Sequence, residues 1–285
     1  MRIFDIKNEF DIELTVSLLK KIIYSISANP LWMIYFYAFI GISIKFAAIY
    51  RYSSFMLGSL LIYFSYIFLL HECVQIRAGI ASGLLLFLIP SLANKERIKS
   101  ILIFIVAVFF HYSALAFFLL FFINPLTFNK RRYIILLICC YLIRLSGFNP
   151  SSSFQALSYI GFMDRFTVYA DGNDEGALSI FSAYQIVKLI FLSILIMKSD
   201  LLAAKSPLFC LLIKISILST AFFVLFAFPG STTIALRTYQ LFSSVEILLI
   251  PMLFFIFREK IGGKLLIVLF SLVLFYSTLK MIIIL

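Results

Sequence analysis

The chain of 285 residues is 63% hydrophobic and only 13% charged, with a mean hydropathy of +1.09. Soluble domains are about 45–50% apolar and about 25% charged, so a water-soluble fold could not bury this much apolar surface. The net charge of +11 would point to nucleic acid in a soluble protein, but basic residues of membrane proteins gather in cytoplasmic loops. We therefore expect a polytopic integral membrane protein that contacts membrane lipids and no nucleic acid.

The apolar segments are long and unbroken, which favours helices over the strands of a membrane barrel. Barrel strands give segments of about 10 residues with alternating polarity, whereas a crossing helix needs about 20 apolar residues. Nine runs approach that helical length: 31–50, 55–70, 76–93, 99–123, 133–148, 178–197, 208–229, 236–257 and 264–285. The sequence thus predicts an all-α bundle of about nine transmembrane helices, forming one transmembrane domain over residues 1–285.

Two further segments are expected at the membrane surface. Residues 1–30 form an interfacial or outer N-terminal segment, because 12–28 is apolar on one face and carries Lys20 and Lys21. The segment 149–177 is the largest polar stretch, and we expect an outer loop that is long enough to build part of a site outside the membrane.

Lysine and arginine in short loops predict the orientation of the helices. The basic loops are Lys95–Lys99, Lys130–Arg132, Lys198–Lys205 and Arg258–Lys264. The last three can all be cytoplasmic, because two apolar runs separate each neighbouring pair. The first two conflict, since only the run 99–123 lies between them. Either the charge rule fails at one loop or this run contains an extra break.

The densest polar cluster is His71, Glu72, Gln75 and Arg77. An ionisable side chain at mid-bilayer costs about 2.5–3.5 kcal/mol on insertion scales, so such residues usually face a cavity or a partner. On one helix Glu72 and Gln75 share a face and Arg77 does not, but a turn around 71–75 would bring them together. The alternative is a set of interfacial polar residues at the tip of a short hairpin.

A second anomaly is His111, near the middle of the run 99–123. It is either a neutral histidine bonded to a helix carbonyl or a histidine that faces a polar cavity and transfers protons. The chain has two histidines, and its four cysteines form no CxxC pair, so we predict neither a metal site nor a disulfide.

The remaining unusual polar residues are cations and tyrosines. They are Arg165 and Tyr169 in the outer loop, Arg237 and Tyr239 at the outer end of a late run, and Arg144 and Lys188 within apolar runs. A solvated loop, or side chains that extend to the headgroups, would look similar, although Lys188 could do so only partly. Several arginines together nevertheless suggest an anionic ligand, because arginine binds phosphate through two hydrogen bonds and stays charged. A lipid diphosphate is the natural membrane ligand of that type.

The segment 71–122 resembles the EpsG/Wzy-type oligosaccharide repeat-unit polymerases. The family pattern is a Q-x-R-x-x-[IL]-A block, a short apolar run, a basic loop, and an apolar run that ends in F-H-x-S-A. The matching residues are Gln75, Arg77, Gly79 and Ala81, then Phe110, His111, Ser113 and Ala114. Arg237–Tyr239, followed by an apolar run and Pro251, resembles the arginine-containing late helix of the family.

This resemblance implies a multi-pass, glycosyltransferase-C-like helical bundle in the bacterial cytoplasmic (inner) membrane. Family members join undecaprenyl-diphosphate-linked oligosaccharide units at the outer face of that membrane. They act in O-antigen (lipopolysaccharide), capsule or exopolysaccharide synthesis, without a metal, cofactor or nucleotide sugar, and a chain-length regulator is an expected partner. The chain departs from the family at its start, where an extra span is expected before the stretch that carries Asp5 and Asp11.

The implied chemistry assigns provisional roles to the candidate residues. Arg77 and Arg237, together with Arg165, would stabilise the leaving diphosphate. Glu72 or His111 would accept the proton of the acceptor hydroxyl, and Glu72 is preferred because it is close to Arg77. Substrate-binding residues would be Gln75, Ser113, Arg165, Tyr169 and Tyr239.

Two other functional classes stay open from the sequence. A lipid-linked oligosaccharide flippase or other transporter would also have intramembrane cations, although nine spans without an internal repeat are atypical of one. A membrane O-acyltransferase would also use a histidine, but its arginine and histidine usually lie near the first helices.

Overall fold

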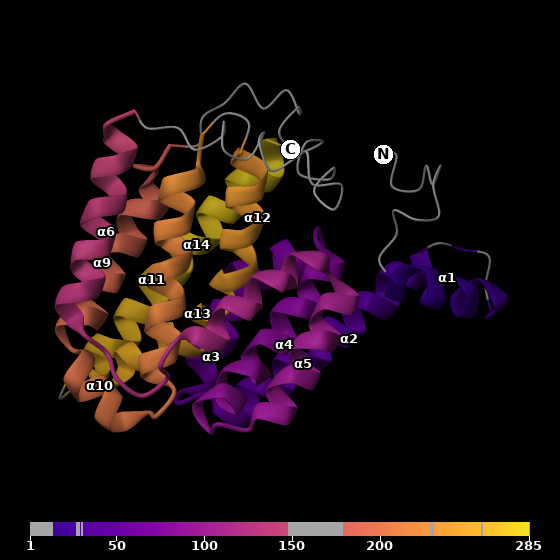
Figure 1. Cartoon of the computed structure of the whole chain (residues 1–285), viewed down its shortest axis with the longest axis horizontal. Coiled ribbons are helices and arrows are strands. Elements are labelled where there is room, and N and C mark those ends of the chain that lie inside the picture. The colour runs from indigo at the N-terminus through magenta and orange to yellow at the C-terminus, as the bar shows by residue number, and fades with distance from the viewer. Residues whose placement is uncertain are drawn as a thin grey trace.

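The fold is entirely helical over the residues that the structure describes, which confirms the all-α class. A computed structural model of the chain describes residues 14–26, 29, 31–147, 179–228, 231–257 and 259–284. In Figure 1 a tilted group of N-terminal helices, α2 to α5, leans against an upright group formed by α6, α9, α11 and α12.

The helices follow one another along the chain with short connections. In order they are α1 (Leu14–Ile26), α2 (Leu31–Tyr52), α3 (Met56–Ile62), η2 (Tyr63–Glu72), α4 (Ile76–Ala93), α5 (Arg97–Phe110), η3 (Tyr112–Phe122), α6 (Lys130–Leu145), α9 (Ala183–Met197), α10 (Ser199–Lys205), α11 (Phe209–Phe226), α12 (Thr232–Ser243), α13 (Glu246–Leu249), η4 (Ile250–Phe255) and α14 (Lys260–Ile284). The segment η2 is a π-helix that continues α3, whereas η3 and η4 are 3₁₀-helices.

Five helical segments of the described chain are long and apolar enough to cross a membrane. They are Leu31–Tyr52, Ile76–Ala93, Phe209–Phe226, Ile234–Phe255 and Lys260–Lys280. The expected runs at 55–70 and 178–197 form shorter apolar helices, and 133–148 corresponds to the 16 residues of α6. The chain is thus a helical membrane protein, in which five of the nine expected runs reach spanning length.

The run 99–123 is a helical hairpin, so the expectation of one helix over this run is wrong. His111 has an extended backbone (φ −157°, ψ 116°) that ends α5, and η3 then turns back. The rings of Phe104 and Phe121 are 5.8 Å apart between centroids, whereas a straight helix would separate these residues by about 25 Å. The extra break that the charge conflict allowed is therefore present, at His111.

The hairpin places the basic loops at one end of the bundle, called here the basic end. It returns the chain to the level at which α5 began, so Lys95–Lys99 and the start of α6 share this end. Lys130 Nζ lies 2.5 Å from Asp200 Oδ2, which ties α6 to α10, and α14 also begins here (Figure 1). Lys99 donates to Glu96 Oε2 at 2.7 Å and lowers the pKa of that carboxyl. The opposite end, called the far end, holds the turn between η2 and α4 and the start of α12.

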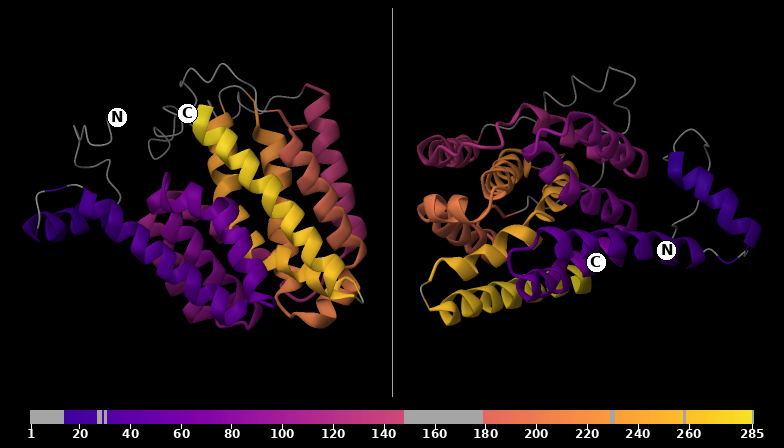
Figure 2. Two further views of the ribbon diagram at one scale, coloured as in Figure 1. Left: turned by 180° about the vertical axis from the view of Figure 1, so that it is seen from behind. Right: turned by 90° about the horizontal axis from the view of Figure 1, so that it is seen from below.

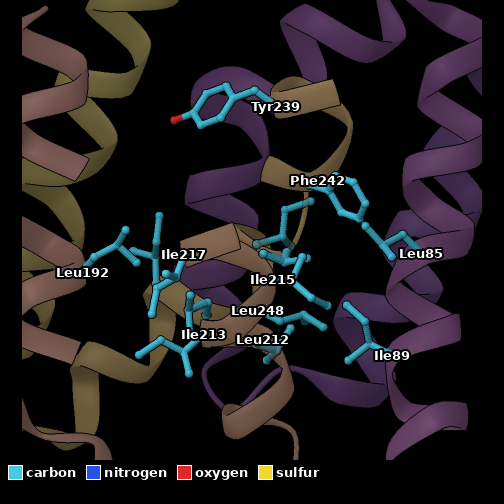
Figure 3. Close-up of a cluster of buried hydrophobic side chains, with 14 of the residues drawn as sticks. Leu85, Ile89, Leu192, Leu212, Ile213, Ile215, Ile217, Tyr239, Phe242 and Leu248 are labelled. Carbon is cyan, nitrogen blue, oxygen red and sulfur yellow. The ribbon is translucent and has the colours of Figure 1, made fainter. Parts of the chain in front are cut away.

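The apolar core is organised around α11. Its apolar side chains are spread around the whole helix, and most of its residues are buried. Figure 3 shows side chains of α11, including Ile213 and Ile217, between Leu192 of α9 and Leu85 and Ile89 of α4. In contrast, α14 crosses the back of the bundle diagonally and leaves one face exposed (Figure 2). An apolar exposed face on a helix of this length fits contact with lipid.

The helix α1 corresponds to the expected surface segment. Thr15 Oγ1 donates to the Phe109 carbonyl at 2.9 Å, so α1 contacts the last turn of α5. Ile23 is buried while Leu18 and Ile22 are exposed. Its orientation in the membrane interface stays a prediction, and the first 13 residues lie outside the described chain.

Candidate functional site

Polar side chains converge where η2 ends and α4 begins. Gln75 N–H donates to the Leu70 carbonyl at 2.8 Å, an i→i−5 bond that extends the π-helical pattern up to the turn. π-Helices are rare and are frequently found at functional sites. The expected turn is present at Cys73–Gln75, but it divides the cluster: His71 and Glu72 are buried, whereas Arg77 is exposed.

The buried carboxylate of Glu72 forms an ion pair with Lys45 of α2. Lys45 Nζ lies 2.5 Å from Glu72 Oε1 and also donates to the Gly79 carbonyl at 2.6 Å, while the Tyr63 hydroxyl donates to the same carboxylate oxygen at 3.4 Å. The exposed fractions of the Lys45 and Glu72 side chains are 0% and 1%. The partner of Glu72 is therefore a lysine from a different helix, and not a residue of the cluster at 71–77.

Two glycines shape the space around this carboxylate. A Cβ atom at Gly41 would lie 2.4 Å from Glu72 Oε2, and one at Gly79 would lie 2.9 Å from it. This oxygen is buried and accepts no hydrogen bond among the described residues. Glu72 therefore fits against two stretches of bare backbone, and a side chain at either glycine would displace it.

His71 extends the same polar network. Its Nδ1 lies 2.6 Å from Ser82 Oγ, and the Ser82 hydroxyl donates to the Gly79 carbonyl at 2.9 Å, the same carbonyl that accepts the lysine. The imidazole lies beside the backbone of Gln240 and within electrostatic range of His111. The network thus connects Glu72 with His71 through Lys45, the Gly79 carbonyl and Ser82.

A second buried ion pair joins α9 to α13. Lys188 Nζ lies 2.6 Å from Glu246 Oε1, and both side chains are fully buried. The Tyr66 hydroxyl of η2 lies 2.9 Å from Glu246 Oε2 and 2.9 Å from the Ser243 carbonyl. Lys188, which the sequence placed too deep in an apolar run to reach the headgroups fully, is thus neutralised by a carboxylate inside the bundle.

Tyr239, predicted to bind substrate, belongs to this second network. Its ring centroid lies 4.1 Å from Lys188 Nζ, and its hydroxyl donates to the Tyr184 hydroxyl at 3.0 Å. Figure 3 shows the side chain extending from α12 towards the side on which Leu192 of α9 lies. Tyr239 is buried, so in this structure it contacts the lysine and not the molecular surface.

Both candidate arginines of the described chain lie at the far end. Gln75 Nε2 donates to Gln240 Oε1 at 2.7 Å, which joins the start of α4 to α12. Arg77 follows Gln75 by two residues, Arg237 precedes Gln240 by three, and both arginines are exposed. These four residues are called here the arginine rim. They place two permanent cations on the two helices that the Gln75–Gln240 hydrogen bond joins, and arginine is well suited to holding a phosphate group.

The other residues that the sequence singled out lie at the hairpin, within the bundle, or outside the described residues. Ser113 is half-buried at the start of η3, two residues beyond His111, which is also half-buried. Arg144 donates to the Ala227 carbonyl at 3.1 Å and stacks on the Phe228 ring at 3.6 Å, so it is engaged within the bundle. The outer-loop candidates Arg165 and Tyr169 lie outside the described residues.

Sequence reasoning missed Lys45, Tyr66 and Ser82. Lys45 offered a signal, because a lysine in the middle of a long apolar run needs a partner inside the membrane. Tyr66 and Ser82 gave none, since tyrosine and serine are ordinary residues of membrane helices. Among the described residues no group of three or more His, Cys, Asp and Glu is placed to hold a metal, and the four cysteines are free thiols.

Comparison with known proteins gives one match. The model of the EpsG family matches residues 2–284, nearly the whole chain. No curated protein and no solved structure matches it, so the glycosyltransferase-C-like fold stays a prediction. The match extends far beyond the segment 71–122 and covers both buried ion pairs and the arginine rim.

Proposed function

The chain belongs to the EpsG family, which is Wzy-type polymerase-like, and we propose that it polymerises oligosaccharide repeat units carried on undecaprenyl diphosphate. The observation that carries this proposal is the family match over residues 2–284. The products are O-antigen, capsular or exopolysaccharide chains. The protein acts in the bacterial cytoplasmic membrane with its basic end inside, as the distribution of lysine and arginine favours, and with the arginine rim outside. A chain-length regulator is the protein partner we propose.

The proposed reaction is a glycosyl transfer that needs no nucleotide sugar. The bond between the anomeric carbon of the growing chain and its diphosphate breaks, and the electron pair leaves with the diphosphate. A new bond forms from the same carbon to a hydroxyl oxygen of the next lipid-linked unit. The proton of that hydroxyl passes to a base on the protein. The two demands on the protein are therefore stabilisation of a diphosphate and acceptance of one proton.

We assign the diphosphate to Arg77 and Arg237. Both residues are exposed, and they lie on α4 and α12, the helices that the hydrogen bond between Gln75 and Gln240 joins. Arginine keeps its charge and offers paired donors that match the oxygens of a phosphate, so it stabilises charge that develops on a leaving diphosphate. Arg165 and Tyr169 of the outer loop remain proposed contacts to substrate, together with Ser113 and the amide of Gln75.

We assign the proton to Glu72, with His111 as the alternative. Glu72 is buried and its charge is neutralised by Lys45, so it can act as the base only if that ion pair opens. His111 is half-buried at the break between α5 and η3, and it is less enclosed than Glu72.

The test is elongation by the purified protein in liposomes that contain a lipid-linked repeat unit and no nucleotide sugar. The wild-type protein should give a ladder of longer glycans. Arg77→Ala should lower the rate by about 10²- to 10³-fold, the usual effect of removing one donor to a developing charge. Arg131→Ala is the matched control, because Arg131 is an exposed arginine at the basic end and its loss should leave the rate unchanged.

Two results would contradict the proposal. If repeat units cross the liposome membrane but never lengthen, the protein is a transporter and not a polymerase. If Arg77→Ala elongates at the wild-type rate, the polymerase reading can stand but the assignment of the diphosphate to this arginine cannot.

A further inference from the structure

The π-helix η2 carries residues of both buried networks. Its hydrogen bonds join residues five apart instead of four apart, and this pattern, called here the π register, decides which way these side chains point. Tyr66 and His71 are five residues apart and both face α12. The Tyr66 hydroxyl lies 2.9 Å from the Ser243 carbonyl, and the His71 ring lies beside the Gln240 backbone. Residues five apart share a face in a π-helix, because its hydrogen bonds join residues i and i+5. The two contacts to α12 are thus a direct consequence of the π register.

An α-helical register would separate these side chains. At about 100° per residue, a spacing of five puts two side chains about 140° apart around the helix axis. Tyr66 and His71 could not then both face α12, and Glu72 would turn away from Lys45. The π form is rarely adopted, so tertiary contacts must hold η2 in it. Tyr66 is the side chain of η2 with direct contacts to both α12 and α13.

The contact that fixes Tyr66 is the buried Lys188–Glu246 pair. Glu246 Oε2 accepts from the Tyr66 hydroxyl at 2.9 Å, while its Oε1 lies 2.6 Å from Lys188 Nζ. Lys188 also lies 4.1 Å from the centroid of the Tyr239 ring, so Tyr239 stabilises it from a second side. Replacing a buried ion pair with apolar residues of similar volume often costs no stability, so stability alone does not explain this pair.

We propose that Tyr66, Glu246 and Lys188 are positioning residues: they hold η2 in its π register and so keep His71 and Glu72 in place beside the arginine rim. Tyr66 is the link, Glu246 accepts its hydroxyl, and Lys188 keeps Glu246 charged and oriented. The effect on polymer formation rests on the proposed function, whereas the effect on η2 does not.

The chain provides a reporter for this register. Cys73 directly follows Glu72 at the end of η2 and is exposed. In a background in which Cys139, Cys140 and Cys210 are replaced by alanine, a membrane-impermeant maleimide reports the accessibility of Cys73 alone. Conversion of η2 towards an α-helix would rotate its end by more than 100° between Tyr66 and Cys73, at roughly 18° per residue. Cys73 would then turn towards the neighbouring helices and react several times more slowly.

Two variants remove the positioning contact in different ways. Tyr66→Phe deletes one hydroxyl and keeps the ring, and Lys188→Met with Glu246→Met replaces the ion pair with apolar side chains of similar length. Each should slow the labelling of Cys73 and lower kcat for elongation on the order of 100-fold, the effect of a misplacement of about 1 Å. KM should change little, because the arginine rim remains intact. A merely destabilised protein would not show slower labelling, since unfolding exposes Cys73.

Lys214→Met is the matched control for loss of a buried lysine. Lys214 is buried on α11 and donates to the Asn124 carbonyl at the end of the hairpin, far along the chain from η2. Its replacement should leave the labelling of Cys73 unchanged.

The outcomes separate the inference from the proposed function. Wild-type labelling and kcat in Tyr66→Phe and in the double variant would overturn the positioning role, and so would slower labelling with an unchanged kcat. If the double variant does not fold, Tyr66→Phe alone decides. If the wild-type protein makes no polymer, the proposed function fails, while the labelling rates still test the register of η2.

Discussion

Replacing Lys45 with methionine should destabilise the protein by several kcal/mol, because the change leaves Glu72 buried without its cation. The exposed fractions of the two side chains are 0% and 1%, and their charged atoms lie 2.5 Å apart. Gly41 and Gly79 close the other side of the carboxylate, so water cannot readily replace the lysine there. Methionine keeps the length of the side chain and its apolar contacts, and thus isolates the loss of charge.

The magnitude follows from this burial. Removing one partner of a buried ion pair typically costs about 3–5 kcal/mol, whereas replacing both partners with apolar residues is often neutral or stabilising. The double variant Lys45→Met with Glu72→Met should therefore have a stability equal to that of the wild type or higher, and any loss should be no more than about 1 kcal/mol. For chains of 150–250 residues, each kcal/mol of lost stability lowers Tm by about 2–4 °C. The loss of about 3–5 kcal/mol in Lys45→Met should therefore lower Tm by roughly 6–20 °C.

The assay is thermal unfolding of the purified protein in a mild detergent, for the wild type, both single variants and the double variant. The double-mutant cycle isolates the coupling between the two side chains. A single Lys45→Met variant with the wild-type Tm would refute the burial of the pair. If the double variant loses as much stability as the two single variants together, then lost packing, and not an unpaired buried charge, causes the destabilisation, and the reasoning is refuted.

Two further changes test the packing and the surface. Gly41→Ala should cost about 1–3 kcal/mol, because its Cβ would lie 2.4 Å from Glu72 Oε2. Gly262→Ala is its control, because the new Cβ would meet only the exposed Phe257 ring, at 3.2 Å. This change should be neutral or should stabilise the helix by up to about 1 kcal/mol. Lys130→Ala should change stability by no more than about 1 kcal/mol, because its partner carboxylate is 84% exposed. The same unfolding assay measures all three, and a large loss in Lys130→Ala or none in Gly41→Ala would contradict the structure.

The class of fold could be predicted from the sequence because the bilayer leaves few alternatives. Unbroken apolar runs with 13% charged residues are compatible with membrane helices and with little else. The break at His111 could be suspected from the charge conflict but not located. It has no proline or glycine to mark it, and it depends on packing between Phe104 and Phe121, which are distant in sequence.

The candidate site was predictable as a set of residues but not as a set of pairs. Glu72 and Lys188 stood out because ionisable side chains are costly inside a membrane. The residue that neutralises each of them comes from another helix, and no spacing along one helix can reveal such a partner. Lys45 therefore went unnoticed, and Glu72 was considered only in relation to the nearby Arg77.

The two ion pairs also explain how so apolar a chain specifies one arrangement of helices. In lipid the hydrophobic effect does not drive helices together, so packing and polar contacts between helices decide which of them meet. Lys45 and Glu72 join α2 to η2, Tyr66 joins η2 to α13, and the Lys188–Glu246 pair joins α13 to α9. One continuous line of polar contacts thus crosses the apolar interior and passes through η2. Because Glu72 ends that same helix, and Gln75 and Arg77 follow it directly along the chain, contacts that specify the packing also help to position this part of the candidate site.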